Sequence, residues 1–203
     1  MLEELYRLES ERIASLGDEV EGDKAHPVFG DGNANDPVIM FIGEAPGREE
    51  AACGRPFVGK AGRQLDEMLE LAGIDRGRVF VTNAVKYRPT KTKNGHVSNR
   101  TPKEFEVRAG LCLLEKEIGL VKPLVLATLG NVPLSALMLL GGGGEKLTVG
   151  DAHGRPASIF VSRQAFRLFP LYHPAASIYN RSLKPVLEED LKTLGEYCRR
   201  IKQ

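Results

Sequence analysis

The stretch PVIMFIGEAPGREEAACGRPFVGKAG, residues 37–62, joins a short apolar run to a long glycine-rich segment. The run 37–43 ends at Gly43 and is typical of a strand that is buried on both faces of a parallel sheet. Apolar residues with helical spacing follow over 62–74, where Gly73 is a stop signal. A strand, a glycine-rich loop and a helix in this order indicate an α/β protein.

Strands and helices continue to alternate along the chain. Apolar runs predict strands at 78–85, 123–130 and 166–174, a short edge strand at 159–162, and helices at 2–16, 101–123, 131–140 and 182–201. Thr101 is expected to cap its helix, with Glu104 completing a capping box, and the glycines 141–144 predict a loop or a helix stop. The predicted fold is a three-layer α/β/α arrangement around a central, mainly parallel four-stranded sheet, in a single domain over 1–203.

The composition excludes several classes of protein. The 203 residues are 42% hydrophobic and 27% charged, which is ordinary for a globular protein. No stretch approaches the roughly 20 apolar residues of a membrane span, and the acidic N-terminus lacks the layout of a signal peptide. We therefore expect a cytoplasmic monomer that contacts no membrane. The three cysteines, at 53, 112 and 198, form no C-x-x-C motif, so we expect reduced thiols.

Charge is unevenly distributed, although the formal net charge is only +1. Six Lys or Arg and no acidic residue lie between Lys86 and Lys103. Such a segment is either a local phosphate-binding surface or an ordinary solvated loop.

The segment GRPFVGKA, residues 54–61, nearly matches the phosphate-binding pattern G-x-x-x-x-G-K-[ST]. However, Ala61 replaces the hydroxyl residue that would hold Mg²⁺, and the preceding strand ends at Gly43, well before the pattern begins. A true phosphate loop follows its strand directly. Binding of a nucleoside triphosphate is therefore a distant alternative.

The stretch GEAPGREEAACGRPFVGKAG, residues 43–62, resembles the first motif and following loop of the uracil-DNA glycosylase superfamily, in its family-4 branch. The resemblance continues at VTNAVKYRP (81–89) and YHPAA (172–176), in the order of the family. It implies hydrolysis of the N-glycosidic bond of a flipped-out deoxyuridine, in double- or single-stranded DNA. The products would be free uracil and an abasic site.

The resemblance also implies a base pocket at the carboxyl ends of the strands. Phe57 would stack on the base, and the side-chain amide of Asn83, which both donates and accepts, would read its edge. Ala45 stands where the best-known branch of the superfamily has a water-positioning aspartate, and would also border the base.

Three residues are expected to carry the chemistry. By resemblance, His173 hydrogen-bonds O2 of the base and stabilises the leaving anion. Glu50 is expected to position water or to support the sugar cation, and Glu44 to arrange the pocket.

Several residues are expected to contact DNA: Lys60, Lys86, Arg88, Arg100, Ile178, Tyr179 and Arg181. Lys86, Arg88 and Arg100 would hold phosphates beside the flipped nucleotide. The segment SIYNR, residues 177–181, matches the loop that wedges into the duplex. Either Ile178 or Tyr179 would fill the vacated stack, unless both pack under the final helix.

The sequence departs from the family at its metal cluster. Family-4 enzymes carry a four-iron four-sulfur cluster on four cysteines, but here the N-terminal region has none, and Tyr87 and Gly110 stand at the third and fourth positions. Cys112 lies two residues beyond the fourth position. We therefore predict no cluster, no other metal and no cofactor. Ordinary packing must then hold the N-terminal segment and the segment 86–103.

Two alternatives remain open beside a uracil-DNA glycosylase. One is a non-catalytic module that binds damaged DNA with the same pocket. The other is a glycosylase for another deaminated base such as hypoxanthine, although Asn83 makes pyrimidine reading more natural. Ala51, which replaces a frequent acidic residue of the motif, leaves the base preference open.

Overall fold

The computed structural model describes residues 1–17, 20–143 and 147–201. Its centre is a six-stranded sheet with the strand order β2-β4-β3-β7-β9-β8. The strands are β2 (Asp31–Gly32), β3 (Ile39–Gly43), β4 (Val79–Asn83), β7 (Val125–Leu129), β8 (Ala157–Val161) and β9 (Gln164–Leu171). Within the residues described, no helix is both long enough and apolar enough to cross a membrane.

The four central strands, β4, β3, β7 and β9, run parallel, and the edge strands β2 and β8 pair antiparallel to their neighbours. This confirms the predicted α/β class and its four parallel strands, which the two edge strands extend to six. The short strand expected at 159–162 is the edge strand β8. The four parallel strands all end on the same side of the molecule, which is where ligands of such sheets bind.

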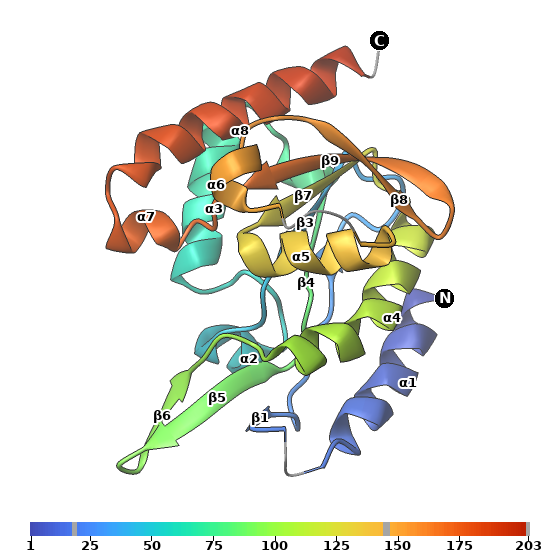
Figure 1. The fold of residues 1–203 in the computed structure, drawn as a ribbon, viewed down its shortest axis with the longest axis vertical. Helices are drawn as coiled ribbons and strands as arrows, with labels where there is room; N and C mark the ends of the chain where they lie inside the picture. Colours follow the sequence, from blue (N-terminus) through green and yellow to red (C-terminus); the bar gives the residue numbers. More distant parts are fainter. Residues whose placement is uncertain (18–19, 144–146, 202–203) are drawn as a thin grey trace.

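Helices cover both faces of the sheet (Figure 1). On one face lie α1 (Leu2–Ala14), α4 (Glu104–Val121) and α5 (Asn131–Leu140), and on the other lie α3 (Lys60–Leu71) and α8 (Leu183–Arg200). Alternate residues of β3 enter the two cores: Met40 and Ile42 join the first, and Ile39 and Phe41 join the second. Because both faces are covered, the central strands are apolar without alternation.

The short helical elements are α2 (Arg48–Cys53), η1 (Arg76–Arg78), α6 (Val149–Ala152) and α7 (Ala176–Tyr179). None of these was predicted. They are too short to show a helical period in the sequence.

The start of α4 differs from the prediction. The helix begins at Glu104, and the carboxylate of Glu106 accepts a 2.6 Å hydrogen bond from the backbone N–H of Lys103. The capping role therefore belongs to Glu106 rather than to Thr101 and Glu104. The predicted stop after Leu140 is confirmed, while residue 144 of the glycine run lies outside the described residues.

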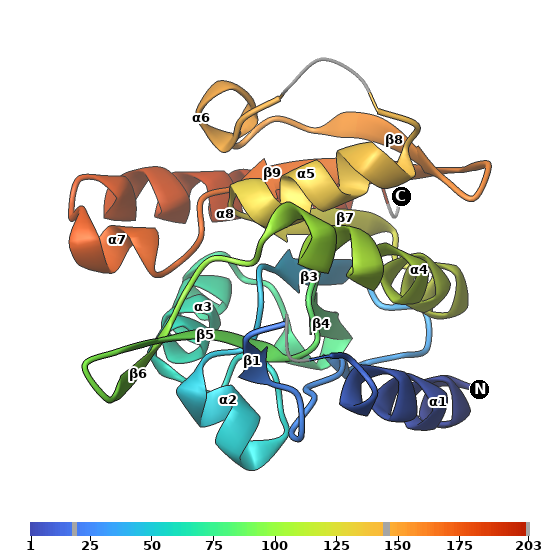
Figure 2. The same ribbon diagram turned by 60° about the horizontal axis from the view of Figure 1, so that its bottom comes forward.

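The basic segment between Lys86 and Lys103 is a β-hairpin. Strands β5 (Arg88–Lys93) and β6 (His96–Asn99) pair antiparallel, and β1 (Gly22–Asp23) pairs with β5. Asn94 and Gly95 close the turn with φ of 51° and 74°, which is typical of an Asn-Gly hairpin turn. The hairpin projects from the body of the molecule in two views (Figures 1 and 2).

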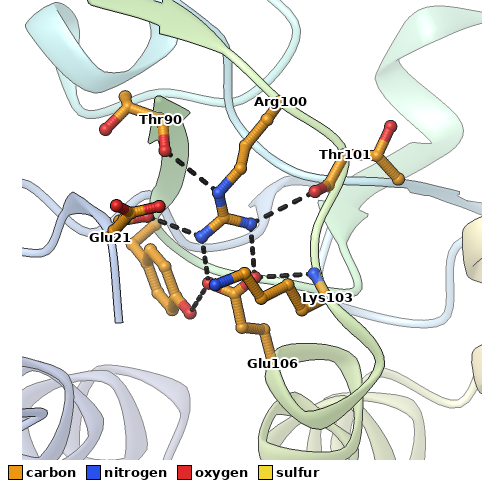
Figure 3. Close-up of polar contacts among 7 residues, drawn as sticks. Glu21, Thr90, Arg100, Thr101, Lys103 and Glu106 are labelled. Atoms are coloured by element: carbon orange, nitrogen blue, oxygen red, sulfur yellow. Dashed lines mark hydrogen bonds and ion pairs between the residues drawn. The ribbon is translucent and has the colours of Figure 1, made fainter. Parts of the chain in front are cut away.

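A polar network at the base of the hairpin joins three segments of the chain (Figure 3). The guanidinium of Arg100 donates to the backbone oxygens of Glu21, Thr90 and Thr101 at 2.7, 3.0 and 3.2 Å. It also makes a bidentate ion pair with Glu106, at 2.5 and 2.9 Å. Packing alone was expected to hold the N-terminal segment and the hairpin, and the structure adds this network.

Candidate active site

A cavity of about 320 Å³ opens at the carboxyl ends of the parallel strands. Six of the predicted site residues line it: Ala45, Glu50, Phe57, Lys60, Asn83 and His173. They come from three separate segments of the chain, namely the stretch 43–62, the end of β4 and the segment after β9, so the fold brings them together. The expected position of the pocket, outside the strand ends, is the one that the structure shows.

The register of the sheet explains how the segments meet. Gly43 and Asn83 are paired at the ends of the parallel neighbours β3 and β4. The chain beyond β4 stays attached to the first motif, because the backbone N–H of Ala84 donates to the carbonyl of Gly43 at 2.9 Å. On the other side, the N–H of Gly130 donates to Leu171 at 2.8 Å, two residues before His173.

Gly43 packs closely against two residues that line the cavity, a role that we did not predict. A Cβ at this position would lie 2.4 Å from Oδ1 of Asn83 and 2.7 Å from Cζ of Phe57. Any side chain would therefore displace both residues expected to bind the base. The glycine that ends the first strand in the sequence was the available signal.

Phe57 is held in a left-handed backbone conformation, with φ of 55°. This conformation is rare for a bulky residue and persists only where its surroundings impose it. Gly62 leaves room for this conformation, because a Cβ there would lie 1.7 Å from the carbonyl oxygen of Phe57. The ring is half-buried and lines the cavity, so one part of it remains available for a ligand.

The carboxylate of Glu50 ties together the two glycine-rich parts of the first motif. Its oxygens accept hydrogen bonds from the N–H groups of Gly47 at 3.1 Å and Gly59 at 2.8 Å. A Cβ at either glycine would lie within 2.8 Å of this carboxylate. The two N–H groups orient the carboxylate while it lines the cavity, so it is an anion held in a fixed position.

His173 is held as a neutral imidazole with a defined tautomer. The backbone N–H of Ala175 donates to its Nδ1 at 3.1 Å, which places the ring proton on Nε2. Burial lowers the pKa of His173 to about 4, and the negative charge of Glu50 opposes the shift only in part. At neutral pH the ring is therefore an uncharged donor through Nε2.

Glu44 lies beside the cavity and is half-buried, but it is not among the residues that line it. Burial raises the pKa of its carboxyl group, and a hydrogen bond with Thr101 opposes this in part. Its carbonyl accepts a 3.1 Å hydrogen bond from the N–H of Val85, which links the first motif to the end of β4.

Two of the predicted phosphate contacts are corrected by the structure. Lys86 is only 2% exposed and pairs with the buried carboxylate of Glu117. Arg100 uses all five of its N–H donors in the network at the base of the hairpin. Neither side chain has a donor left for a phosphate, because both are occupied inside the protein.

The hairpin contributes a side chain to the cavity that the sequence did not suggest. Asn99, at the end of β6, lines the cavity, and Nε of Arg88 donates to its Oδ1 at 2.7 Å. Arg88 therefore orients a cavity residue, and its remaining donors are partly exposed. The only sequence signal for Asn99 was its place in the basic segment. This signal is weak, because polar residues are common in such a segment.

The predicted wedge residues lie on and after α7, beside the cavity. Ile178 and Arg181 line a neighbouring groove of about 650 Å³, and Lys60 lines both this groove and the cavity. Tyr179 is 90% exposed, whereas Ile178 is half-buried. An aromatic ring this exposed is available to an external partner.

The phosphate-loop alternative does not fit the structure. Helix α2 separates β3 from Gly59, where α3 begins, so the pattern at 54–61 does not directly follow a strand. The strand–loop–helix connection that a phosphate loop requires is therefore absent from this segment.

The residues at the expected cluster positions do not fit an iron–sulfur cluster. Tyr87 is buried and its hydroxyl donates to Glu106 at 2.7 Å. A Cβ at Gly110 would lie 2.3 Å from the carbonyl oxygen of Ala84, which leaves no room for a cysteine. In the described ranges, no three His, Cys, Asp or Glu side chains are grouped as metal ligands.

Comparison with known proteins identifies the family of this chain. A family model described as the uracil DNA glycosylase superfamily matches residues 29–194. The chain belongs to this superfamily. The matched range begins before β3 and ends within α8, so it includes the whole cavity and the central sheet.

Curated relatives in the superfamily match most of the chain. The type-4 uracil-DNA glycosylase of Pyrobaculum aerophilum is 42% identical over 75% of this chain and 74% of its own length. That of Sulfurisphaera tokodaii is 39% identical over 78% of this chain and 69% of its own. The enzyme of Thermotoga maritima is 33% identical over 98% of this chain and 97% of its own.

Proposed function

We propose that this chain is a uracil-DNA glycosylase that hydrolyses the N-glycosidic bond of a flipped-out deoxyuridine and leaves an abasic site. The observation that carries the proposal is the convergence of Phe57, Asn83 and His173 on one cavity. They supply an aromatic face, an amide that reads an edge, and a neutral donor, which are the groups that a flat pyrimidine needs. The type-4 relatives support the same activity.

In this proposal the base lies on the ring of Phe57, with its edge toward Asn83. The amide of Asn83 donates to one carbonyl of uracil and accepts from the neighbouring N3–H, a pattern that cytosine does not offer. The clash that any side chain at Gly43 would make with both residues explains why the site has a glycine there. The protein would therefore select uracil over cytosine by hydrogen bonding as well as by the shape of the cavity.

Cleavage of the bond places negative charge on the departing base and positive charge on the sugar. Nε2–H of His173 donates to O2 of the base as this charge develops, and a neutral imidazole does so without protonating it. The fixed carboxylate of Glu50 stabilises the sugar cation and orients the attacking water. Glu44, which is half-buried and does not line the cavity, supports the position of the first motif through its bond with Val85.

The DNA would reach the cavity past the hairpin and α7. Lys91 and Lys93 are exposed on β5, and they replace Lys86 and Arg100 as the candidate phosphate contacts of the basic segment. On the opposite side, Tyr179 is the candidate for the ring that fills the vacated stack. Lys60 and Arg181 are exposed beside it and would contact the same strand.

We also propose that activity requires no iron–sulfur cluster. The support is that Tyr87 is committed to Glu106 and that Gly110 packs against the backbone of Ala84. The network around Arg100 joins the N-terminal segment, the hairpin and α4 in this region. The chain would thus stabilise these segments with polar side chains.

The direct test is incubation with an oligonucleotide that carries one uracil, followed by alkaline cleavage and by chromatography of the released base. We expect strand scission at the uracil, release of free uracil and no cut in a cytosine-containing control. The variant His173→Asn should fold and lose most of the activity. Iron analysis of the active protein checks the cluster in the same sample.

The alternatives give different outcomes in this experiment. Tight binding of uracil-containing DNA without release of base would favour a non-catalytic module. Release of hypoxanthine in preference to uracil would favour the second glycosylase activity. No scission at high protein concentration, with a folded protein, would reject the proposed function.

A further inference from the structure

Two charged side chains meet in the interior directly behind the predicted base-reading strand. Nζ of Lys86 lies 2.6 Å from Oε2 of Glu117, and the two side chains are 1% and 0% exposed. Lys86 follows β4 by three residues, and Glu117 lies on α4. No step of the proposed mechanism uses this pair, and its burial keeps it out of contact with DNA.

The ammonium group of Lys86 makes three hydrogen bonds, which is its full capacity. Besides Glu117, it donates to Oγ1 of Thr82 at 2.6 Å and to the backbone oxygen of Asn83 at 2.5 Å. Glu117 in turn accepts from the hydroxyl of Tyr6 at 2.8 Å. One of the three bonds therefore ends on the peptide of the residue that faces the base.

The pairing of this part of the chain with the sheet ends at Asn83. This asparagine is the last residue of β4, and its pairing with Gly43 is the last of the β3–β4 register. Beyond it, the N–H groups of Ala84 and Val85 donate to the first motif. The carbonyl of Asn83 takes its hydrogen bond from Lys86 instead, so a side chain fixes the orientation of this peptide.

A stabilising role alone explains the pair poorly. Taking two charges out of water is costly, and well-packed apolar residues usually stabilise a core as much or more. A fully satisfied buried pair does, however, define one geometry, because any other arrangement leaves a charge unpaired. Because Lys86 also donates to the carbonyl of Asn83, the geometry that the pair defines includes the peptide of Asn83.

We propose that Lys86 and Glu117 are positioning residues that hold the peptide of Asn83, and hence its side-chain amide, in the orientation that reads the base. The proposal rests on the proposed function, because it assumes that Asn83 contacts the substrate. Lys86 acts on the reaction only through Asn83, and Glu117 only through Lys86. Neither residue touches the substrate.

The test is a set of variants assayed for uracil release. Lys86→Met with Glu117→Leu removes both charges at once, so that neither is left alone in the core. We expect kcat/KM to fall by about tenfold to a hundredfold, as misplacement of a binding group does. The control Tyr6→Phe removes a hydrogen bond of Glu117 but keeps the bond from Lys86 to Asn83, and it should retain wild-type activity.

The decisive comparison repeats the double substitution in an Asn83→Ala background. If the pair acts through Asn83, removing it from this background should change kcat/KM by less than about twofold, since coupled residues are non-additive. An equal loss in both backgrounds would overturn the proposal, as would full activity of the double variant. If the double variant does not fold, Glu117→Gln is compared in the same two backgrounds, with the same criterion. A wild-type protein without uracil release rejects the proposed function instead.

Discussion

The hydroxyl of Tyr87 donates a 2.7 Å hydrogen bond to the carboxylate of Glu106, and both side chains are buried. Tyr87 follows the strand of Asn83, while Glu106 lies in the first turn of α4 and also pairs with Arg100. Burial raises the pKa of Glu106, but hydrogen bonds from Arg100, Tyr87 and the N–H of Lys103 outweigh it and lower that pKa. The carboxylate is therefore an anion at the centre of the network.

The first prediction concerns this network. Arg100→Met leaves Glu106 buried without its cation and should lower the free energy of unfolding by about 3 kcal/mol. Denaturant unfolding measures the loss. The matched control is Arg108→Met, which breaks an exposed pair with Glu104 on the same helix and should change stability little. Equal stability of the two variants would contradict a central role for Arg100.

The second prediction concerns Gly43, which packs against two residues that line the cavity. Gly43→Ala should abolish uracil release, because the new Cβ would lie 2.4 Å from Asn83 and 2.7 Å from Phe57. The control is Gly119→Ala on α4, where a Cβ meets nothing within 4 Å. That substitution should keep full activity and stabilise the helix by up to about 1 kcal/mol. Wild-type activity of Gly43→Ala would contradict the requirement that Asn83 and Phe57 keep these positions for uracil release.

The third prediction concerns pH. The pKa of His173 is about 4 in the folded protein against an ordinary value of 6.5. Between these values the unfolded chain binds a proton that the folded protein does not. His173 should therefore reduce stability progressively as pH falls from 6.5 towards 4, and have no effect above this range.

Two measurements check this titration. The imidazole signals of His173 in an NMR titration should move with a midpoint near 4. The difference in unfolding free energy between wild type and His173→Asn should change in the same pH range. A midpoint near 6.5 would mean that the ring is charged during catalysis in mildly acidic solution, contrary to the proposed role of a neutral donor.

The fourth prediction concerns the hairpin. Lys91→Gln with Lys93→Gln should weaken binding of duplex DNA and reduce its dependence on salt, by about one in the log–log slope for each phosphate that the protein no longer neutralises. Cleavage of a uracil-containing trinucleotide, which we expect to be too short to contact Lys91 and Lys93, should be unchanged. Binding at several salt concentrations and both cleavage rates are measured on the same preparations.

The control for the hairpin removes the same charge from the opposite end of the molecule. Lys116 lies next to Glu115, which accepts a hydrogen bond from Ser162 in the turn before β9. This turn is at the amino end of β9, away from the cavity. Lys116→Gln with Arg163→Gln should leave the salt slope at the wild-type value. If both double variants lower the slope equally, the hairpin has no special role.

Much of the fold was predictable because its elements are regular. The central strands are apolar runs flanked by glycine or proline, and the long helices show a clear period. The hairpin was missed, although Asn94 and Gly95 are a strong turn signal, because its strands are polar and exposed. Apolar patterning is informative only where a face is buried.

The sequence by itself determined the class of fold and six of the residues that line the cavity, because the segments that follow the parallel strands meet at one edge of the sheet. Only the tertiary structure decided what each basic residue does. Lys86, Arg88 and Arg100 have the same charge in one short segment, yet one is buried with Glu117, one orients Asn99 and one joins the network of Glu106. Distant segments of the chain determine how deeply each basic side chain is buried and which groups pair with it. The local sequence therefore does not show either property.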